Sequence, residues 1–248
     1  EEEMKPGFEI DNDCLVMRTA LPHTQVLPYF PNYEYWNPTP GTILDYRDPL
    51  NKAGHTQRAF MNYWAIRSFV ESNGGIGLAC GGAGVQPPAC LSLDLCGNEE
   101  HPTYGGQYTG VHVKGDASNL SMFLDNSFSC ILSLHLIEHL PCNRLIGTET
   151  AEEKIKLSCP GREIGDILRY HWLRVLKPGG YIASIIPDNK AAMDGGSHVF
   201  YQDPSHCHAW QADEFYNDVL GKLTNVLEIV EFNTFNNNFS FNIVGKKK

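Results

Sequence analysis

Residues 123–140 read FLDNSFSCILSLHLIEHL, and this stretch decides the fold class. Its middle, residues 130–134, is an apolar run with little alternation of polar side chains. Such a run is typical of a strand that is buried on both faces, as in a parallel sheet covered by helices. His135, Glu138 and His139 follow directly. The stretch therefore predicts a buried strand with titratable side chains at its carboxyl end.

Short apolar runs bounded by turn residues flank this stretch on both sides. The residues between 161 and 176 place apolar side chains at helical spacing, and Lys177-Pro178-Gly179-Gly180 ends that predicted helix because proline cannot continue it. The sequence thus predicts an open α/β, Rossmann-like sheet, mostly parallel, whose last two strands are antiparallel. The predicted strands cover residues 76–79, 90–95, 111–114, 130–134, 181–186, 227–232 and 239–244.

The first part of the chain has a different composition. Residues 1–55 are rich in proline and aromatic side chains, which excludes long helices there, whereas residues 57–71 have a helical pattern. We divide the chain into an amino-terminal extension, 1–55, and a main domain, 56–248. The extension either packs its aromatic rings on the main domain or forms a lid or acceptor wall, and the two roles are compatible.

Small and acidic residues follow the first three predicted strands, where ligands bind in open α/β sheets. Gly81 allows the backbone to approach a ligand closely, Asp94 is placed to bind ribose hydroxyls, and Asp116 is placed to bind an adenine amino group. Each feature alone is also typical of a structural turn or a solvated cap. Together they predict a nucleoside-type pocket. Its predicted residues are Ala79, Cys80, Gly81, Asp94, Leu95, Asp116, Ala117 and Leu134.

Four segments of the main domain resemble class I S-adenosylmethionine-dependent methyltransferases. They are residues 77–84 (GLACGGAG), 115–120 (GDASNL), 123–140 and 173–181 (LRVLKPGGY). The resemblance implies a seven-stranded methyltransferase sheet, S-adenosyl-L-methionine as cofactor, and a cofactor cleft over the first, second and fourth strands.

The first glycine loop departs from the family pattern. Gly77, Ala79 and Ala83 replace an acid and two glycines, and only residues 85–89 (VQPPA) separate the loop from the second strand. A parallel crossover normally needs about a dozen residues, so the first crossover helix is expected to be reduced. This feature is similar to methyltransferases associated with glycan assembly. Without that helix, we expect side chains or water to hold the cofactor's carboxylate.

The chemical class of the methyl acceptor decides which catalytic groups the protein needs. A sugar hydroxyl is a weak acid and needs a base or a metal ion to lose its proton, and His139 or His206 is the predicted base. His135, Glu138 and His139 alternatively form a divalent metal site, with His206 as a later ligand, as the resemblance to small-RNA 2′-O-methyltransferases implies. The alternatives are an ordinary helix start for residues 135–139 and a solvated surface loop for the second group, which consists of His198, Asp203, His206 and His208.

Composition limits the partners. The net charge of −10, from 19 Lys and Arg against 29 Asp and Glu, makes nucleic acid an improbable partner, and no apolar run is long enough to span a membrane. The eight cysteines include no CxxC pair, which favours reduced thiols and a cytoplasmic location. The first residues do not resemble a signal peptide, and the sequence does not start with methionine. We therefore expect it to belong to a longer polypeptide, with glycosyltransferase domains as possible fusion partners.

These observations lead to one functional expectation and two alternatives. We expect an O-methyltransferase that modifies a sugar hydroxyl of a glycan or glycoconjugate. The alternatives are a methyltransferase for another small molecule, such as a natural product or quinone precursor, and a non-catalytic scaffold of the same fold. The altered glycine loop favours the scaffold, and the supply of histidines favours the enzyme.

Overall fold

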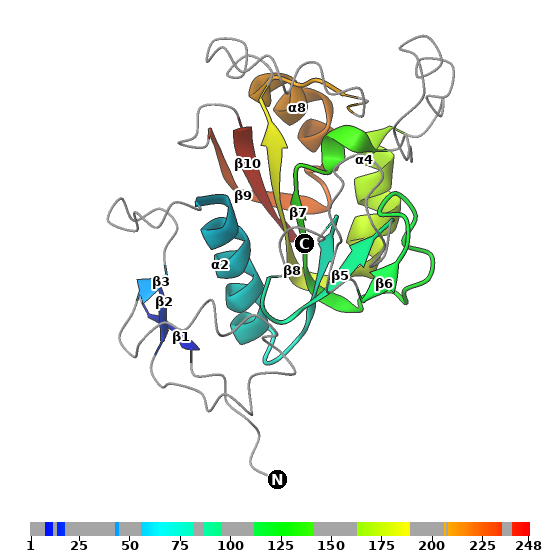
Figure 1. Ribbon diagram of the computed structural model, residues 1–248. Coiled ribbons are helices and arrows are strands. Elements are labelled where there is room, and N and C mark those ends of the chain that lie inside the picture. Colours follow the sequence, from blue (N-terminus) through cyan, green and yellow to red (C-terminus); the bar gives the residue numbers. More distant parts are fainter. Residues whose placement is uncertain are drawn as a thin grey trace, which may run out of the picture.

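The centre of the molecule is a seven-stranded sheet with strand order β6-β5-β4-β7-β8-β10-β9 (Figure 1). The computed structural model describes residues 8–11, 14–17, 43–44, 56–81, 87–95, 112–140, 163–188, 206, 208–234 and 240–248. The first five strands in that order are parallel, whereas β10 is antiparallel to both β8 and β9. The predicted α/β sheet, mostly parallel with an antiparallel carboxyl-terminal pair, is confirmed. The strands are β4 (Gly77–Cys80), β5 (Cys90–Asp94), β6 (Val113–Lys114), β7 (Phe128–Leu134), β8 (Leu176–Pro187), β9 (Leu227–Thr234) and β10 (Ser240–Lys247).

Helices cover both faces of this sheet (Figure 1). The helix α2 (Thr56–Glu71) lies on one face, where Phe60 and Trp64 pack against Leu132 of β7. A continuous helical segment lies on the other face and buries Trp172 against Ile131. Neighbouring residues of β7 thus face opposite layers, which explains the unbroken apolar run of that strand. The segment on the second face consists of α4 (Ile164–Ile167), a π-helical turn η4 (Leu168–Trp172) and α5 (Leu173–Val175).

The predicted turn at residues 177–180 is part of β8. Leu176 already has extended backbone angles and starts that strand, so the preceding helix ends at Val175. The pairing of β7 with β8 shifts register between Phe128 and Cys130, where the two glycines of this stretch are accommodated. Proline and glycine therefore end the helix as predicted, but they form an irregular start of the strand.

The first crossover is short, as the sequence predicted. The parallel strands β4 and β5 are joined by residues 81–89, of which 81 and 87–89 are described and are not helical. Ala89 has a positive φ of 52°, an uncommon conformation for a residue with a side chain. Its carbonyl accepts a hydrogen bond of 2.8 Å from the Gly77 amide. The tight entry into β5 is therefore held by the start of β4.

Gly77 is required by the packing of a buried and a partly buried thiol beside it. A Cβ at this position would contact Cys130 Sγ and lie 2.7 Å from Cys90 Sγ. We expect Gly77→Ala to lower the free energy of unfolding by about 1–3 kcal/mol, because overpacking a core forces its neighbours to move. Gly165→Ala is the control, since a Cβ there meets open space within α4. Urea denaturation measures both variants, and equal effects would contradict this account of Gly77.

The rest of the described chain surrounds this core. Past β8 lie α8 (Ala212–Asp218) and the 3-10 helix η5 (Leu220–Leu223). Near the amino terminus, β1 (Phe8–Asp11), β2 (Cys14–Met17) and β3 (Ile43–Leu44) form a separate antiparallel sheet. Most of the predicted lid or acceptor wall over residues 1–55 lies outside the described residues, so its role stays a prediction. Among the helices described, none is both long enough and apolar enough to cross a membrane.

Candidate functional site

The candidate site lies at the edge of the sheet where five parallel strands end. Their last or following residues are Gly81 after β4, Asp94 in β5, Asp116 after β6, His135 after β7 and Asp188 after β8. Because these strands are parallel and neighbouring, their carboxyl ends meet at one edge (Figure 1). Each of these five strands thus ends in, or is followed by, a polar or small residue on the same side of the molecule.

Gly81 has the backbone conformation that only glycine adopts easily. Its φ is +65°, its amide donates to the Leu93 carbonyl at 2.8 Å, and a Cβ would lie 3.0 Å from Leu136 Cδ1. The turn after β4 therefore touches the segment after β7. Ala79 and Cys80, which were predicted to contact the cofactor, are each 1% exposed, and burial raises the pKa of the Cys80 thiol. Only their backbone is available to a ligand at this edge.

We expect Gly81→Ala to destabilise the protein and to weaken its affinity for S-adenosylhomocysteine. A non-glycine residue in the left-handed region costs about 1–2 kcal/mol, and the contact with Leu136 adds to that cost. Gly221→Ala is the matched control, because an added Cβ there makes only an ordinary contact at 3.6 Å. Urea unfolding and calorimetric titration measure the two effects. An alanine variant as stable as the protein itself would contradict the assigned strain.

The residues at the ends of β5 and β6 are linked to each other. Asp94 is the last residue of β5 and is partly exposed, and its carbonyl accepts from the Gly115 amide at 2.9 Å. Leu95 is 38% exposed beside it. At the end of β7, Leu134 packs partly buried against the cluster beneath α2. The Asp94 side chain is thus positioned near the edge by two strand ends, and its role in binding ribose stays a prediction.

Asp116 forms a local turn with Ser118. Its Oδ1 accepts from the Ser118 amide at 2.8 Å, and its Oδ2 accepts from the Ser118 hydroxyl at 2.9 Å. The buried Ala117 carbonyl accepts from Trp172 Nε1 at 2.8 Å. The loop is therefore held in place by the helix beneath it. A carboxylate oxygen can accept more than one hydrogen bond, and the predicted contact of Asp116 with adenine stays a prediction.

His135 begins the group of titratable side chains that follows β7. It has a positive φ of 48°, and its amide donates to the Ile185 carbonyl at 2.9 Å. Its Nε2 lies 3.0 Å from Gln57 Nε2 and 3.4 Å from Ser240 Oγ. Burial, together with the nearby His206 and His139 rings, lowers the pKa of His135 from 6.5 to about 4. The ring is therefore neutral at pH 7.

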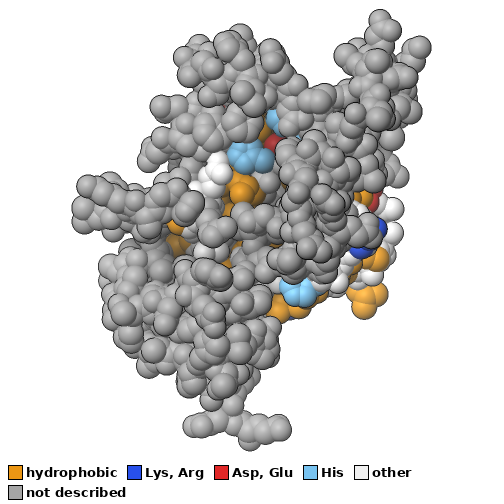
Figure 2. Space-filling view, viewed as in Figure 1, with side chains coloured by type: hydrophobic (Ala, Val, Ile, Leu, Met, Phe, Trp, Pro, Cys, Tyr) orange, Lys and Arg blue, Asp and Glu red, His pale blue; other side chains and the backbone are white. Residues whose placement is uncertain are grey.

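Glu138, His139 and His206 form the closest cluster of metal-ligand atoms that the described residues contain. One ligand atom from each lies within 4.8 Å of the others. Glu138 is 2% exposed, and its Oε1 lies 3.7 Å from His139 Nε2. The rings of His139 and His206 meet edge to face with their centroids 4.7 Å apart. Figure 2 shows histidine side chains beside an acidic one in a hollow on this face.

A short segment after residue 205 carries His206 to this cluster. The His208 amide donates to the Glu138 carbonyl at 3.1 Å, and the His208 ring stacks on Trp210 with centroids 4.4 Å apart. Trp210 in turn meets Phe215 of α8 edge to face. Burial lowers the pKa of His208 below its usual value. The segment is therefore anchored between the 3-10 helix η3 (Ile137–His139) and α8.

The sequence predicted His135, Glu138 and His139 as metal ligands, with His206 as a later one. In the cluster that the structure brings together, His206 stands in place of His135. Glu138, His139 and His206 come together, whereas His135 approaches Glu138 Oε1 at 3.7 Å through Nδ1 and points Nε2 at Gln57 and Ser240. No pattern in the sequence around residue 135 predicted its contacts with Gln57 and Ser240, because these two residues belong to α2 and β10. His198 and Asp203, the other polar residues of the second group, lie outside the described residues.

The donor set suits a transition-metal ion. One carboxylate oxygen and two imidazole nitrogens are ligands for zinc, manganese, iron or cobalt. Two ligand atoms on one ion, at bonds of about 2.1 Å and a tetrahedral angle, lie about 3.4 Å apart. The 3.7 Å between Glu138 Oε1 and His139 Nε2 is near that spacing and is too long for a hydrogen bond. These three residues could therefore hold a divalent cation, and His135 Nδ1 lies at the same 3.7 Å from Glu138 Oε1.

The observed sheet has seven strands. Its five parallel strands and terminal antiparallel pair match the architecture that the sequence resemblance implied. No protein-family model matches the sequence, and no curated protein matches it significantly. Solved structures of low sequence identity resemble the chain, and several of them are described as methyltransferases.

Three of these structures indicate the extent of the likeness. A chain from the complex of the Haloferax volcanii Trm112 methyltransferase activator with a methyltransferase has a TM-score of 0.45 and 12% identity, over 70% of this chain and 83% of its own. An S-adenosylmethionine-dependent methyltransferase from Mesorhizobium loti has a TM-score of 0.42 and 11% identity, over 73% and 98%. A SAM-dependent methyltransferase from Methanosarcina mazei has a TM-score of 0.40 and 17% identity, over 70% and 92%. Identities this low carry no information about the acceptor.

Proposed function

We propose that the protein is an S-adenosylmethionine-dependent O-methyltransferase whose acceptor is a sugar hydroxyl of a glycan or glycoconjugate. The observation that carries the proposal is the convergence of Glu138, His139 and His206 at the carboxyl edge of the parallel strands. Such a cluster is needed for a weakly acidic acceptor and is superfluous for a phenolate or a neutral amine. Its presence therefore favours an alcohol.

The residues at the ends of β4, β5 and β6 fit the cofactor. Gly81 presents backbone without a Cβ, and its place cannot be taken by a larger residue. Asp94 supplies a carboxylate for the ribose diol, and Asp116 keeps lone pairs for the adenine amino group. When bound, the cofactor supplies a methyl group already activated on a sulfonium. The protein's task is then to align the acceptor oxygen and to assist its loss of a proton.

Glu138, His139 and His206 would hold a divalent cation, which supplies a Lewis acid that lowers the pKa of a bound hydroxyl. The segment after β7 touches Gly81 through Leu136, so this cluster lies beside the predicted cofactor pocket. His135 is neutral, and its contacts with Gln57 and Ser240 hold its ring at the side of the cluster. Without a cation, His139 or His206 would accept the hydroxyl proton directly through a ring nitrogen.

A labelled-methyl assay tests the acceptor class. The full chain is incubated with labelled S-adenosylmethionine and with equal concentrations of oligosaccharides, a catechol and a primary amine. We expect transfer to saccharides alone. Transfer to the phenol or the amine, and never to a saccharide, would remove the proposed acceptor. Calorimetry with S-adenosylhomocysteine tests the cofactor separately, since an absence of binding favours a non-catalytic scaffold.

Chelator treatment tests the cation. We expect dialysis against a chelator to lower the rate of methyl transfer at least about a hundredfold, because a sugar hydroxyl then loses its Lewis acid. Adding zinc, manganese or cobalt back should restore the rate. Affinity for S-adenosylhomocysteine should stay unchanged, because Gly81 and Asp94 do not belong to the cluster. A rate that survives chelation would assign the chemistry to a histidine base.

A further inference from the structure

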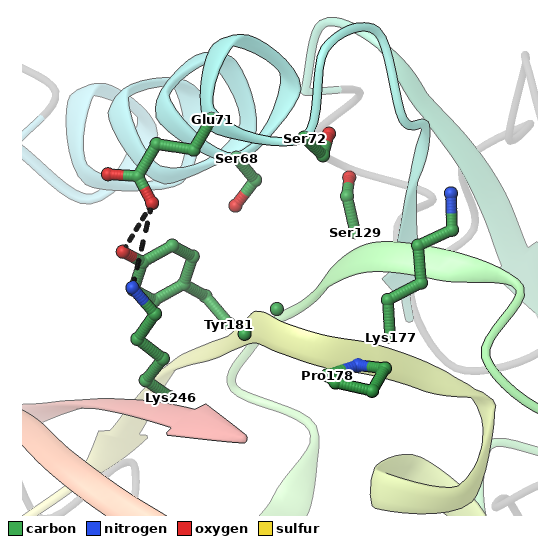
Figure 3. A pocket seen from close by; sticks show the side chains of 10 residues that line it. Ser68, Glu71, Ser72, Ser129, Lys177, Pro178, Tyr181 and Lys246 are labelled. Carbon is green, nitrogen blue, oxygen red and sulfur yellow. Dashed lines mark hydrogen bonds and ion pairs between the residues drawn. The ribbon is translucent and has the colours of Figure 1, made fainter. Parts of the chain in front are cut away.

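A cavity of about 350 Å³ lies at the opposite edge of the sheet (Figure 3). Its walls come from the last turn of α2, from the amino-terminal ends of β7 and β8, and from the end of the antiparallel strand β10. Small-molecule sites commonly enclose about 300–1,000 Å³. The cavity therefore has room for a small metabolite, at a place that the proposed methyl transfer does not use.

Ser68 directs a buried hydroxyl into this cavity. The residue is 2% exposed, and its Oγ has no hydrogen-bond partner among the described residues. Figure 3 shows the side chain projecting from α2 between Glu71 and Ser72. The Ser72 hydroxyl, by contrast, accepts from the Gly75 amide, and the Ser129 hydroxyl donates to the Gly75 carbonyl. A buried hydroxyl left without a partner is costly, so an acceptor atom in the cavity would stabilise it.

The ionic side chains that line the cavity are one acid, Glu71, and two lysines, Lys177 and Lys246. Glu71 accepts from Tyr181 Oη at 2.6 Å and from Arg67 Nε at 2.9 Å, and Lys246 Nζ lies 4.0 Å from the same carboxylate. Arg67 and Lys246 thus compensate the negative charge of Glu71. Lys177 lines another side of the cavity and forms no ion pair within the part of the chain that the structure describes.

We propose that this cavity binds a small phosphate ester. The phosphate would accept hydrogen bonds from Lys177 and Ser68, since phosphate carries acceptor oxygens and negative charge while both side chains donate. Hydroxyl groups of the ester would face Glu71, whose carboxylate accepts hydrogen bonds. The positive charge of Lys177 favours a phosphate ester over a neutral polyol.

Calorimetric titration of the full chain with glycerol 3-phosphate tests the proposal, with glycerol as the neutral probe. We expect saturable binding of the ester and none of glycerol. Lys177→Gln should weaken the affinity at least tenfold, equal to about 1.4 kcal/mol. Ser68→Ala should weaken it about threefold without lowering the urea midpoint, because the hydroxyl bonds to nothing in the described protein. Lys222→Gln is the matched control, since Lys222 pairs with Glu163 outside this cavity.

Two results would overturn the phosphate site. One is no saturable heat with glycerol 3-phosphate, and the other is unchanged affinity in Lys177→Gln. A Glu138→Gln variant separates this site from the methyl-transfer site. It should bind glycerol 3-phosphate as tightly as the unmodified protein, and loss of ester binding in that variant would place the ligand at the other edge.

Discussion

Glu138→Gln lowers the turnover number for methyl transfer about 10²- to 10³-fold and leaves the affinity for S-adenosylhomocysteine within threefold of the unmodified protein. The substitution keeps the shape of the side chain but removes the negative charge from the centre of the cluster with His139 and His206. An amide is a poorer cation ligand than a carboxylate. Steady-state kinetics and calorimetry measure the two quantities on the same preparations.

The matched control is Glu163→Gln. Glu163 is exposed and pairs with Lys222 at 2.9 Å on the surface, so its replacement should change neither turnover nor cofactor affinity. His139→Ala should reproduce the loss of turnover with cofactor affinity largely kept. If either site variant loses cofactor affinity as strongly as turnover, the cluster serves the cofactor and its assigned role is wrong.

Asp94→Asn weakens the affinity for S-adenosylhomocysteine about a hundredfold. A carboxylate that accepts two hydroxyl donors makes charge-assisted hydrogen bonds of about 1.5–3 kcal/mol each, and an amide offers one oxygen acceptor in their place. Asp94 is the last residue of β5, and its backbone carbonyl accepts from the Gly115 amide in both variants. Urea unfolding checks that the Asn variant is folded.

Asp213→Asn is the control for this measurement. Asp213 is an exposed residue in the first turn of α8 and does not follow any of the parallel strands, so its replacement should leave binding unchanged. If Asp94→Asn binds S-adenosylhomocysteine as tightly as the control, the nucleoside does not lie over β5. The prediction of a cofactor pocket at this edge would then fail, and the proposed function with it.

The strands that carry the site were predictable because burial on both faces leaves a visible pattern. Cys130 and Leu132 face α2 while Ile131 faces the opposite helices, so β7 has to be apolar almost throughout. The short link before β5 was predictable for a related reason, since too few residues separate two apolar runs for a crossover helix. Because the strands are parallel, the residues that follow them lie at one edge of the sheet. Predicting this edge needs no information beyond the order of the strands.

Side-chain roles at that edge were less accessible to sequence reasoning. Ala79 and Cys80 lie at the right end of β4, but their side chains point into the core and only their backbone remains for a ligand. Asp116 lies at the right end of β6, but it bonds to Ser118 two residues later. Position at a strand end is a property of the pattern, whereas the direction and partners of a side chain depend on its neighbours.

The sequence by itself determined the layers of this protein and the edge at which its candidate site lies, because both follow from local hydrophobic periodicity and from the parallel order of strands. Only the tertiary structure decided that His206 joins Glu138 and His139, that His135 turns to Gln57 and Ser240, and that Ser68 lines a cavity at the opposite edge. These contacts join segments far apart in the chain. Their partners are selected by packing between elements, which no local pattern records.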